Sequence, residues 1–236
     1  MANHGKQFEL EPTLINSEPT LKEYRYGMFE LFRAGGPLMW IILFCSVIAL
    51  TIIFERMLAL RKARVVPANF GAQVIDMLNS SKVTRERIEV IRKHSPLGSI
   101  LAAGLSNVSH GKEDIKEALE EAGKLVVYNM GRYLNTLGTI ASITPLIGLL
   151  GTVIGMIKVF TAITAVGVGD PTVLSGGISE ALITTAAGLS VGIPCLMFYR
   201  YFRSRINGLT VLLEENALAL VDAVKNKALA NNTVIK

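Results

Sequence analysis

The sequence YLNTLGTIASITPLIGLLGTVIGMI, residues 133–157, contains no charged residue. It is longer than the roughly 20 apolar residues that a helix needs to cross a bilayer. After Lys158 the apolar run continues to residue 166, and the sequence GVGDP at 167–171 then predicts a turn. The stretch therefore predicts a membrane-spanning helix, and it decides the fold class.

Two further apolar runs accompany it, one at residues 34–54 and one at 173–200, where Glu180 is the only charge before Arg200. The whole chain of 236 residues is 50% hydrophobic and 18% charged, whereas soluble domains are about 25% charged. We therefore expect an all-α integral membrane protein. Three transmembrane helices, at 34–54, 133–166 and 173–200, should continue as long helices into a cytoplasmic helical domain.

The distribution of cations predicts the topology. Arg56, Arg61, Lys62 and Arg64 follow the first span, and three arginines close the third, whereas the turn between the last two spans has none. Positive residues remain on the cytoplasmic side. The predicted segments are a periplasmic N-terminal segment (1–33), a cytoplasmic helical domain (55–132), a periplasmic turn (167–172) and a cytoplasmic C-terminal helix (201–236).

The cytoplasmic segments show helical periodicity. Apolar residues recur at steps of three and four from Glu113 to Leu134, which predicts one continuous helix that runs into the second span. Pro67, Ser95-Pro96 and Gly111 are the expected breaks upstream. The tail from residue 207 to 229 has the same periodicity, so it should pack on that helix.

Several other classes of protein do not fit the sequence. The net charge of +5 is distributed by topology, and aromatic residues do not alternate with the basic ones, which argues against nucleic-acid binding. Cys45 and Cys195 lie in apolar runs and are expected to pack as small hydrophobic residues. No signal peptide is apparent in residues 1–30. The spans contain no His and no Asp, so we expect no metal, no cofactor and no enzymatic activity.

Small residues form a strip along the second span. Gly148, Gly151, Thr152 and Gly155 recur at spacings of three and four, and such strips let helices approach closely in a membrane. The glycines are expected to mediate helix packing, including contacts between copies of the chain. The Thr152 hydroxyl could have either of two roles: it could bond to the backbone of its own helix, or it could line a polar path.

Glu180 is the strongest functional candidate, because a charge inside a membrane span is costly. Counted from the turn near residue 169, Glu180 and Lys158 both lie 11 residues along their helices, about 16 Å deep. A structural alternative is therefore an ion pair between them, or a Lys158 side chain that extends to the membrane surface. A functional role and these structural roles both remain open.

The threonines add a polar layer. Thr152 and Thr185 share a level about 25 Å from the turn. Thr184 follows Glu180 by one helical turn, whereas Thr185 lies about 140° away from Glu180 around the helix. Spacing favours Thr184 as the neighbour of Glu180, and the rotation of the helix decides which threonine faces the interior.

Two segments carry a resemblance to a known family. The sequences TIASITPLIGLLGTVIGMIKVF (139–160) and GISEALITTAAGLSVGIP (177–194) resemble the signature of the MotA/TolQ/ExbB proton-channel family. Thr152, Glu180 and Thr185 match the threonine, glutamate and second threonine of that signature, and Pro145 and Pro194 match its prolines. The three-span layout with ERMLALRKARVVPANF (55–70) is similar to the ExbB branch. A four-span MotA fits less well, and TolQ-like chains usually carry a Trp where this chain has Ile154.

The resemblance implies a motor subunit of the bacterial inner membrane. Five copies form a homo-oligomer around an ExbD-like single-span partner, whose aspartate carries the proton, and the complex energises a TonB-like protein. Thr152, Thr185 and Glu180 then line the wall of the proton path. The alternatives are a TolQ-like subunit of the Tol-Pal system and a scaffold that conducts no ions.

Overall fold

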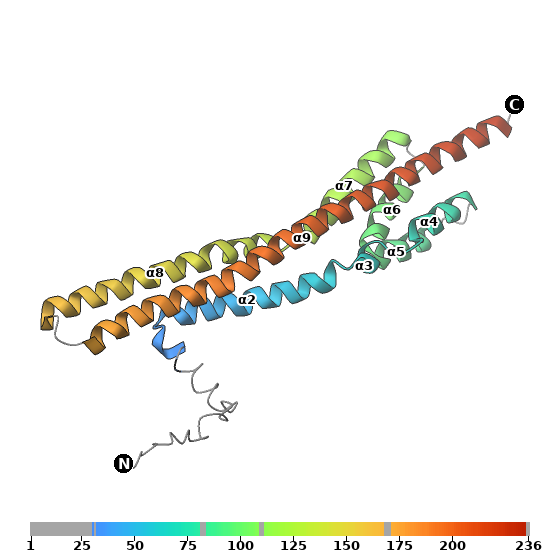
Figure 1. The fold of residues 1–236 in the computed structure, drawn as a ribbon. Helices are drawn as coiled ribbons and strands as arrows, with labels where there is room; N and C mark the ends of the chain where they lie inside the picture. The colour runs from blue at the N-terminus through green and yellow to red at the C-terminus, as the bar shows by residue number, and fades with distance from the viewer. Residues whose placement is uncertain (1–29, 31, 81–83, 109–110, 168–170, 235–236) are drawn as a thin grey trace, which may run out of the picture. The chain divides into compact units, whose positions relative to one another are not determined.

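The computed structural model describes residues 30, 32–80, 84–108, 111–167 and 171–234. Its elements in these ranges are all helices (Figure 1): α2 Leu38–Ala59, α3 Lys62–Val65, α4 Phe70–Asn79, α5 Arg85–His94, α6 Pro96–Ser106, α7 Lys112–Met130, α8 Leu134–Val166 and α9 Pro171–Val234. Within the described ranges, α2, α8 and α9 supply three stretches long and apolar enough to cross a membrane. The predicted all-α membrane fold is confirmed. Residues 1–29 and 31 of the predicted N-terminal segment and residues 168–170 of the predicted turn lie outside the described residues.

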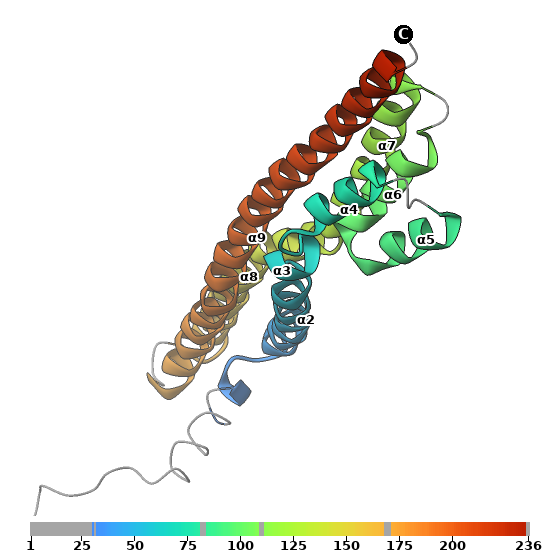
Figure 2. The same ribbon diagram turned by 90° about the vertical axis from the view of Figure 1, so that its right-hand side faces the viewer.

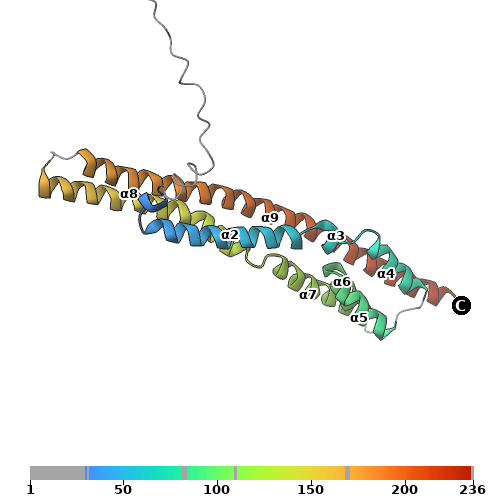
Figure 3. The same ribbon diagram turned by 90° about the horizontal axis from the view of Figure 1, so that it is seen from below.

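The helices divide between two compact units, and α2, α8 and α9 contribute to both. The first unit contains the start of α2 up to residue 41 together with residues 147–187. In it, the second part of α8 and the first part of α9 lie side by side (Figures 1 and 3). Small residues bring the two helices together, since a Cβ at Gly177 would lie 2.6 Å from Cγ2 of Val159.

The second unit contains residues 42–146 and the chain from 188 onward. Here α6 packs on both α5 and α7 (Figure 2). Ser95 begins α6 by accepting a hydrogen bond from the backbone N–H of Gly98 at 3.0 Å, and Pro96 occupies the first turn, where its missing N–H costs nothing. Leu97 and Leu101 of α6 are fully buried in the core of this unit.

The expected breaks upstream of the second span are present. α5 ends at His94 and α6 begins at Pro96, while Gly111 directly precedes α7. Pro67 lies between the short helix α3 and α4. In each case the break follows from a residue that disfavours or cannot continue a helix.

The prediction of one continuous helix from residue 113 into the second span is wrong. α7 ends at Met130 and α8 begins at Leu134, because Tyr133 adopts a left-handed backbone conformation with φ of 63°. A left-handed residue interrupts a right-handed helix. The guanidinium groups of Arg56 and Arg132 lie 5.6 and 4.9 Å from the centre of the Tyr133 ring, within the range of cation–π contacts.

Arg56 also holds the end of α7. Its side chain is buried, and one guanidinium nitrogen donates to the carbonyl oxygens of Asn129 at 3.2 Å and Met130 at 2.9 Å. Both carbonyls belong to the last turn of α7, and that of Asn129 also accepts the backbone N–H of Arg132 at 3.3 Å. Glu55 pairs with the same guanidinium group, so the buried charge is compensated. The end of α2 is therefore attached to the end of α7.

The other two long helices extend beyond the predicted spans. α2 continues past residue 54 to Ala59, and α9 joins the third apolar run and the tail in one helix from Pro171 to Val234. In the second unit, α7 and α9 come close to α6 at one point. A Cβ at Gly104 would lie 2.8 Å from Cδ2 of Leu119 on α7 and 3.0 Å from Cδ2 of Leu220 on α9. The tail is thus packed near α7, as its periodicity predicts.

Candidate functional site

Glu180 and Lys158 form an ion pair between α9 and α8 in the first unit. The Lys158 ammonium donates to both carboxylate oxygens of Glu180, to Oε1 at 2.7 Å and to Oε2 at 2.8 Å. The Glu180 side chain is 20% exposed, whereas that of Lys158 is 51% exposed. The two residues therefore meet at one depth, as counting from the turn predicts, and the Glu180 carboxylate is the more enclosed of the two charges.

Thr184 is the threonine that lies next to Glu180. Its side chain is fully buried, and its hydroxyl oxygen lies 2.7 Å from the carbonyl oxygen of Glu180 and 2.9 Å from that of Gly35. The single hydroxyl hydrogen is shared between two acceptors, one on the preceding turn of α9 and one in the segment before α2. The prediction from spacing that Thr184 is the neighbour of Glu180 agrees with these contacts.

Thr152 and Thr185 bond to successive carbonyl groups of α8. The Thr152 hydroxyl donates to the carbonyl oxygen of Leu149 at 2.6 Å, and the Thr185 hydroxyl donates from α9 to that of Gly148 at 2.8 Å. The two side chains therefore share a level, as predicted from the helix rise. Thr152 bonds to its own helix, which was the structural alternative for it, and both threonine side chains are half-buried.

The glycine strip of α8 packs inside the chain. Gly148, Gly151 and Gly155 are buried, and a Cβ at Gly151 would lie 2.5 Å from Cγ2 of Thr184. A Cβ at Gly155 would lie 2.7 Å from that of Ala181. The expected packing role agrees with these contacts, while the expected contact of the strip with another copy stays a prediction. Its glycines are covered by α9 of the same chain.

Pro145 and Pro194 lie inside α8 and α9, respectively, within the second unit. Pro145 packs against Gly192, where a Cβ would lie 2.5 Å from Cγ of the proline and 3.3 Å from the carbonyl oxygen of Ala141. That carbonyl has no helical partner, because proline carries no N–H group. The close approach of the two helices at this level therefore requires a glycine at position 192.

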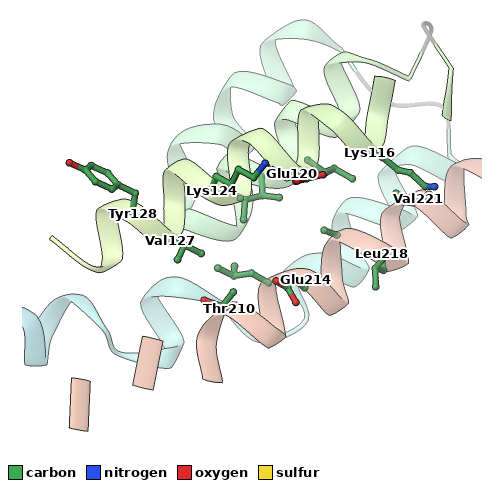
Figure 4. Close-up of a pocket in the computed structure, with 14 residues that line it drawn as sticks. Lys116, Glu120, Lys124, Val127, Tyr128, Thr210, Glu214, Leu218 and Val221 are labelled. Carbon is green, nitrogen blue, oxygen red and sulfur yellow. Dashed lines mark ion pairs between the residues drawn. The ribbon is translucent and has the colours of Figure 1, made fainter. Parts of the chain in front are cut away.

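A groove of about 870 Å³ lies between α7 and α9 in the second unit (Figure 4). Leu119, Val127 and Leu213 belong to its apolar lining, and Glu120 and Lys124 form an ion pair of 2.7 Å on its α7 side. The hydrogen bond from Lys124 and its charge lower the pKa of the Glu120 carboxyl. Because both side chains of this pair are exposed, it marks a solvated helix face and adds little to stability.

Sequence reasoning did not single out three residues that contact the candidate site or the helix pair. Gly35 and Gly36 lie beside Thr184 and Glu180, and Gly192 lies beside Pro145. A Gly-Gly-Pro sequence at 35–37 directly before an apolar run was a usable signal, because it predicts a turn at the start of that helix. No local sequence pattern predicts that this turn contacts Glu180 and Thr184 on α9.

Comparison with known proteins identifies similar sequences. The family model of the MotA/TolQ/ExbB proton channel family matches residues 92–215. A biopolymer transport protein ExbB homologue of Methanothermobacter thermautotrophicus is 32% identical over 185 residues, which cover 76% of this chain and 64% of the relative. An ExbB-like protein of Synechocystis is 33% identical over 181 residues, 73% of this chain and 69% of the relative.

Shorter stretches of the chain match both ExbB and TolQ proteins, the two branches that the sequence motifs suggest. The biopolymer transport protein ExbB of Salmonella typhimurium is 37% identical over 117 residues, 48% of either chain. The Tol-Pal system protein TolQ of Haemophilus influenzae is 41% identical over 73 residues, 31% of this chain and 32% of the relative. The chain thus spans between about a third and two thirds of the length of these relatives, and the ExbB-type matches cover more of it than the TolQ match.

Proposed function

The chain belongs to the MotA/TolQ/ExbB proton channel family, and on this basis we propose that it is a motor subunit of the bacterial inner membrane. With an ExbD-like partner, it uses the proton motive force to energise a TonB-like protein for transport across the outer membrane. The names of the ExbB relatives support the transport role, and their matches cover more of this chain than the TolQ match does.

The observation that carries this proposal is the position of Glu180. It is an acidic side chain within an apolar helix pair, it is mostly enclosed, and the hydroxyl of Thr184 lies on the next turn. A carboxylate in such surroundings exerts a strong electric field, because little water is present to screen it. We propose that this field acts on the protonation of an aspartate carried by the partner.

The remaining site residues form the wall of the path in this proposal. Thr152 and Thr185 present hydroxyl groups at one level of α8. Five copies of the chain, arranged as a homo-oligomer in the bilayer, surround the ExbD-like helices, so that these groups form a layer around the partner. Lys158 compensates the charge of Glu180 and limits the space in which the carboxylate moves.

The proposed topology places the N-terminus in the periplasm and the tail in the cytoplasm. It predicts that cysteines introduced at Glu120 and Lys225, both exposed positions, react with a membrane-impermeant thiol reagent only after the inner membrane is opened. Labelling is measured by a mass shift of the modified chain. The natural cysteines are poor targets, because Cys195 is buried and Cys45 is half-buried in an apolar helix. If these cysteines react in intact spheroplasts, where the reagent reaches only the periplasmic side, the proposed topology is wrong.

The function is tested by its dependence on the proton gradient. Cells that lack this chain should lose active uptake across the outer membrane, and expression of the chain should restore it. A protonophore should abolish the restored uptake while the chain remains in the membrane at the same level. Uptake that resists the protonophore would favour a scaffold. Loss of envelope integrity with normal uptake would favour the Tol-Pal alternative.

A further inference from the structure

The segment before α2 makes a tight turn at Gly35 and Gly36. Gly36 adopts a left-handed conformation with φ of 68°, and its carbonyl oxygen accepts the N–H of Met39 at 3.3 Å. Residues with a side chain adopt this conformation only at a cost in free energy. The turn therefore fixes where α2 begins, at Leu38.

This turn lies against the carboxylate of Glu180. A Cβ at position 36 would overlap with Oε1 of Glu180, and it would lie 3.1 Å from the carboxylate carbon. The same Oε1 accepts a hydrogen bond from Lys158 at 2.7 Å. The carboxylate group thus contacts both the backbone of the turn and the ammonium group of Lys158.

A hydrogen bond attaches the turn to the helix that carries Glu180. The Thr184 hydroxyl lies 2.9 Å from the carbonyl oxygen of Gly35, and the Thr184 side chain is fully buried. The same hydroxyl lies 2.7 Å from the carbonyl oxygen of Glu180, so it contacts both the turn and its own helix. The distance between the turn and Glu180 is therefore set by a bond one helical turn away, and all of these residues lie in the first unit.

From these contacts we propose that the Gly35–Gly36 turn positions the Glu180 carboxylate. The turn occupies the space beside Oε1 and keeps the carboxylate directed toward Lys158, and Thr184 holds the turn in place. Gly36 is a positioning residue, because it acts through Glu180. The proposal rests on the proposed role of Glu180 in proton-driven transduction, and it adds the start of the first span to the parts of the chain that control this group.

A functional consequence follows from the order of the contacts. A displacement of the start of α2 changes the distance between Gly36 and Oε1, and the carboxylate then gains or loses space to leave Lys158. The first span is thereby connected to the acidic group without contributing a charged side chain of its own. Contacts made by the start of α2 with neighbouring molecules are expected to alter the orientation of Glu180.

The test measures how readily Lys158 and Glu180 can be joined by a chemical cross-link, which reports their proximity independently of transport activity. Membranes that contain the full chain are treated with dicyclohexylcarbodiimide, an apolar reagent that activates carboxyl groups. The Lys158 amine then displaces the activated group, so that an amide joins the two side chains and the oxygen leaves with the urea. Mass spectrometry of the digested chain quantifies the peptide pair joined through Lys158 and Glu180. In the parental chain the pair should couple readily, because the nitrogen and oxygen atoms are already in hydrogen-bond contact.

Gly36→Ala is expected to reduce this coupling by about tenfold. The added methyl group forces the Glu180 side chain out of its preferred rotamer, and the free-energy cost of that change corresponds to about a tenfold smaller population of the paired conformation. Gly167→Ala is the matched control. Gly167 also has a positive φ, of 77°, but a Cβ there meets no atom within 4 Å. Both variants place a side chain at a positive φ, so a larger effect of Gly36→Ala reports the contact with Glu180.

A second pair of variants covers the case in which Gly36→Ala does not accumulate. Thr184→Val removes the hydroxyl that bonds to Gly35 and should lower coupling, whereas Thr184→Ser keeps the hydroxyl and should preserve it. Equal coupling in Gly36→Ala and Gly167→Ala, or in Thr184→Val and Thr184→Ser, would overturn the positioning role. Reduced coupling in Gly36→Ala with parental proton-driven uptake would retain that role and contradict the proposed function of Glu180 instead.

Discussion

Replacement of Glu180 by glutamine is expected to lower proton-driven uptake by about 100-fold, the scale on which the loss of one preorganised electrostatic group slows a reaction step. Glutamine keeps the volume and hydrogen-bonding capacity of the side chain but cannot ionise. The substitution also leaves the Lys158 ammonium without its carboxylate partner, so the amount of protein in the membrane should fall as well. Uptake is therefore measured per molecule of assembled protein.

The double variant Glu180→Gln with Lys158→Met separates these two effects. It removes both charges of the ion pair, and it should restore the protein level without restoring uptake. Lys158→Met alone serves as the control for the loss of the lysine. If the double variant transports at the parental rate, Glu180 serves only to neutralise Lys158, and its proposed role in the proton path is wrong.

Gly151→Leu is expected to separate α8 from α9 and to destabilise the chain by about 3 kcal/mol or more, because overpacking of a tight contact moves the backbone. The first added carbon alone would lie 2.5 Å from Cγ2 of Thr184, and Thr184 is fully buried. The thermal unfolding midpoint of the purified protein in detergent measures the effect. Gly176→Leu on α9 is the control, since a Cβ at Gly176 meets nothing within 4 Å.

A milder pair of substitutions identifies the contact itself. Gly151→Ala should lower the unfolding midpoint, and Thr184→Ser should partly rescue it, because serine lacks the Cγ2 atom that the new methyl group approaches. Serine also keeps the hydroxyl that bonds to Gly35. Additive effects of Gly151→Ala and Thr184→Ser would show that the two positions are not coupled through this contact.

Features along a single helix could be predicted from the sequence. The depths of Glu180 and Lys158 follow from the rise per residue on the two sides of one turn, so their ion pair was among the expected outcomes. The contact of Thr184 with Glu180 follows from the period of the helix. The spans follow from the lengths of apolar runs, because the bilayer imposes one thickness on all of them.

Features that join distant segments could not be predicted in this way. Nothing in the pattern around Gly36 specifies that it lies beside Glu180, because this contact depends on the rotation and packing of α2. The break at Tyr133 was missed for a related reason. Tyrosine rarely adopts a positive φ, and the contacts with Arg56 that accompany this conformation come from another helix.

The contact between Pro145 and Gly192 has a mechanical consequence for α8 and α9. Each proline removes one backbone hydrogen bond from its helix, and the contact of Pro145 with Gly192, two residues before Pro194, places both missing bonds at nearly the same level. The bending stiffness of the helix pair is therefore lowest there. Bending of α8 and α9 should therefore concentrate at this level, and both helices should bend there together. No proline interrupts the backbone hydrogen bonds of the turns that carry Glu180 and Thr184.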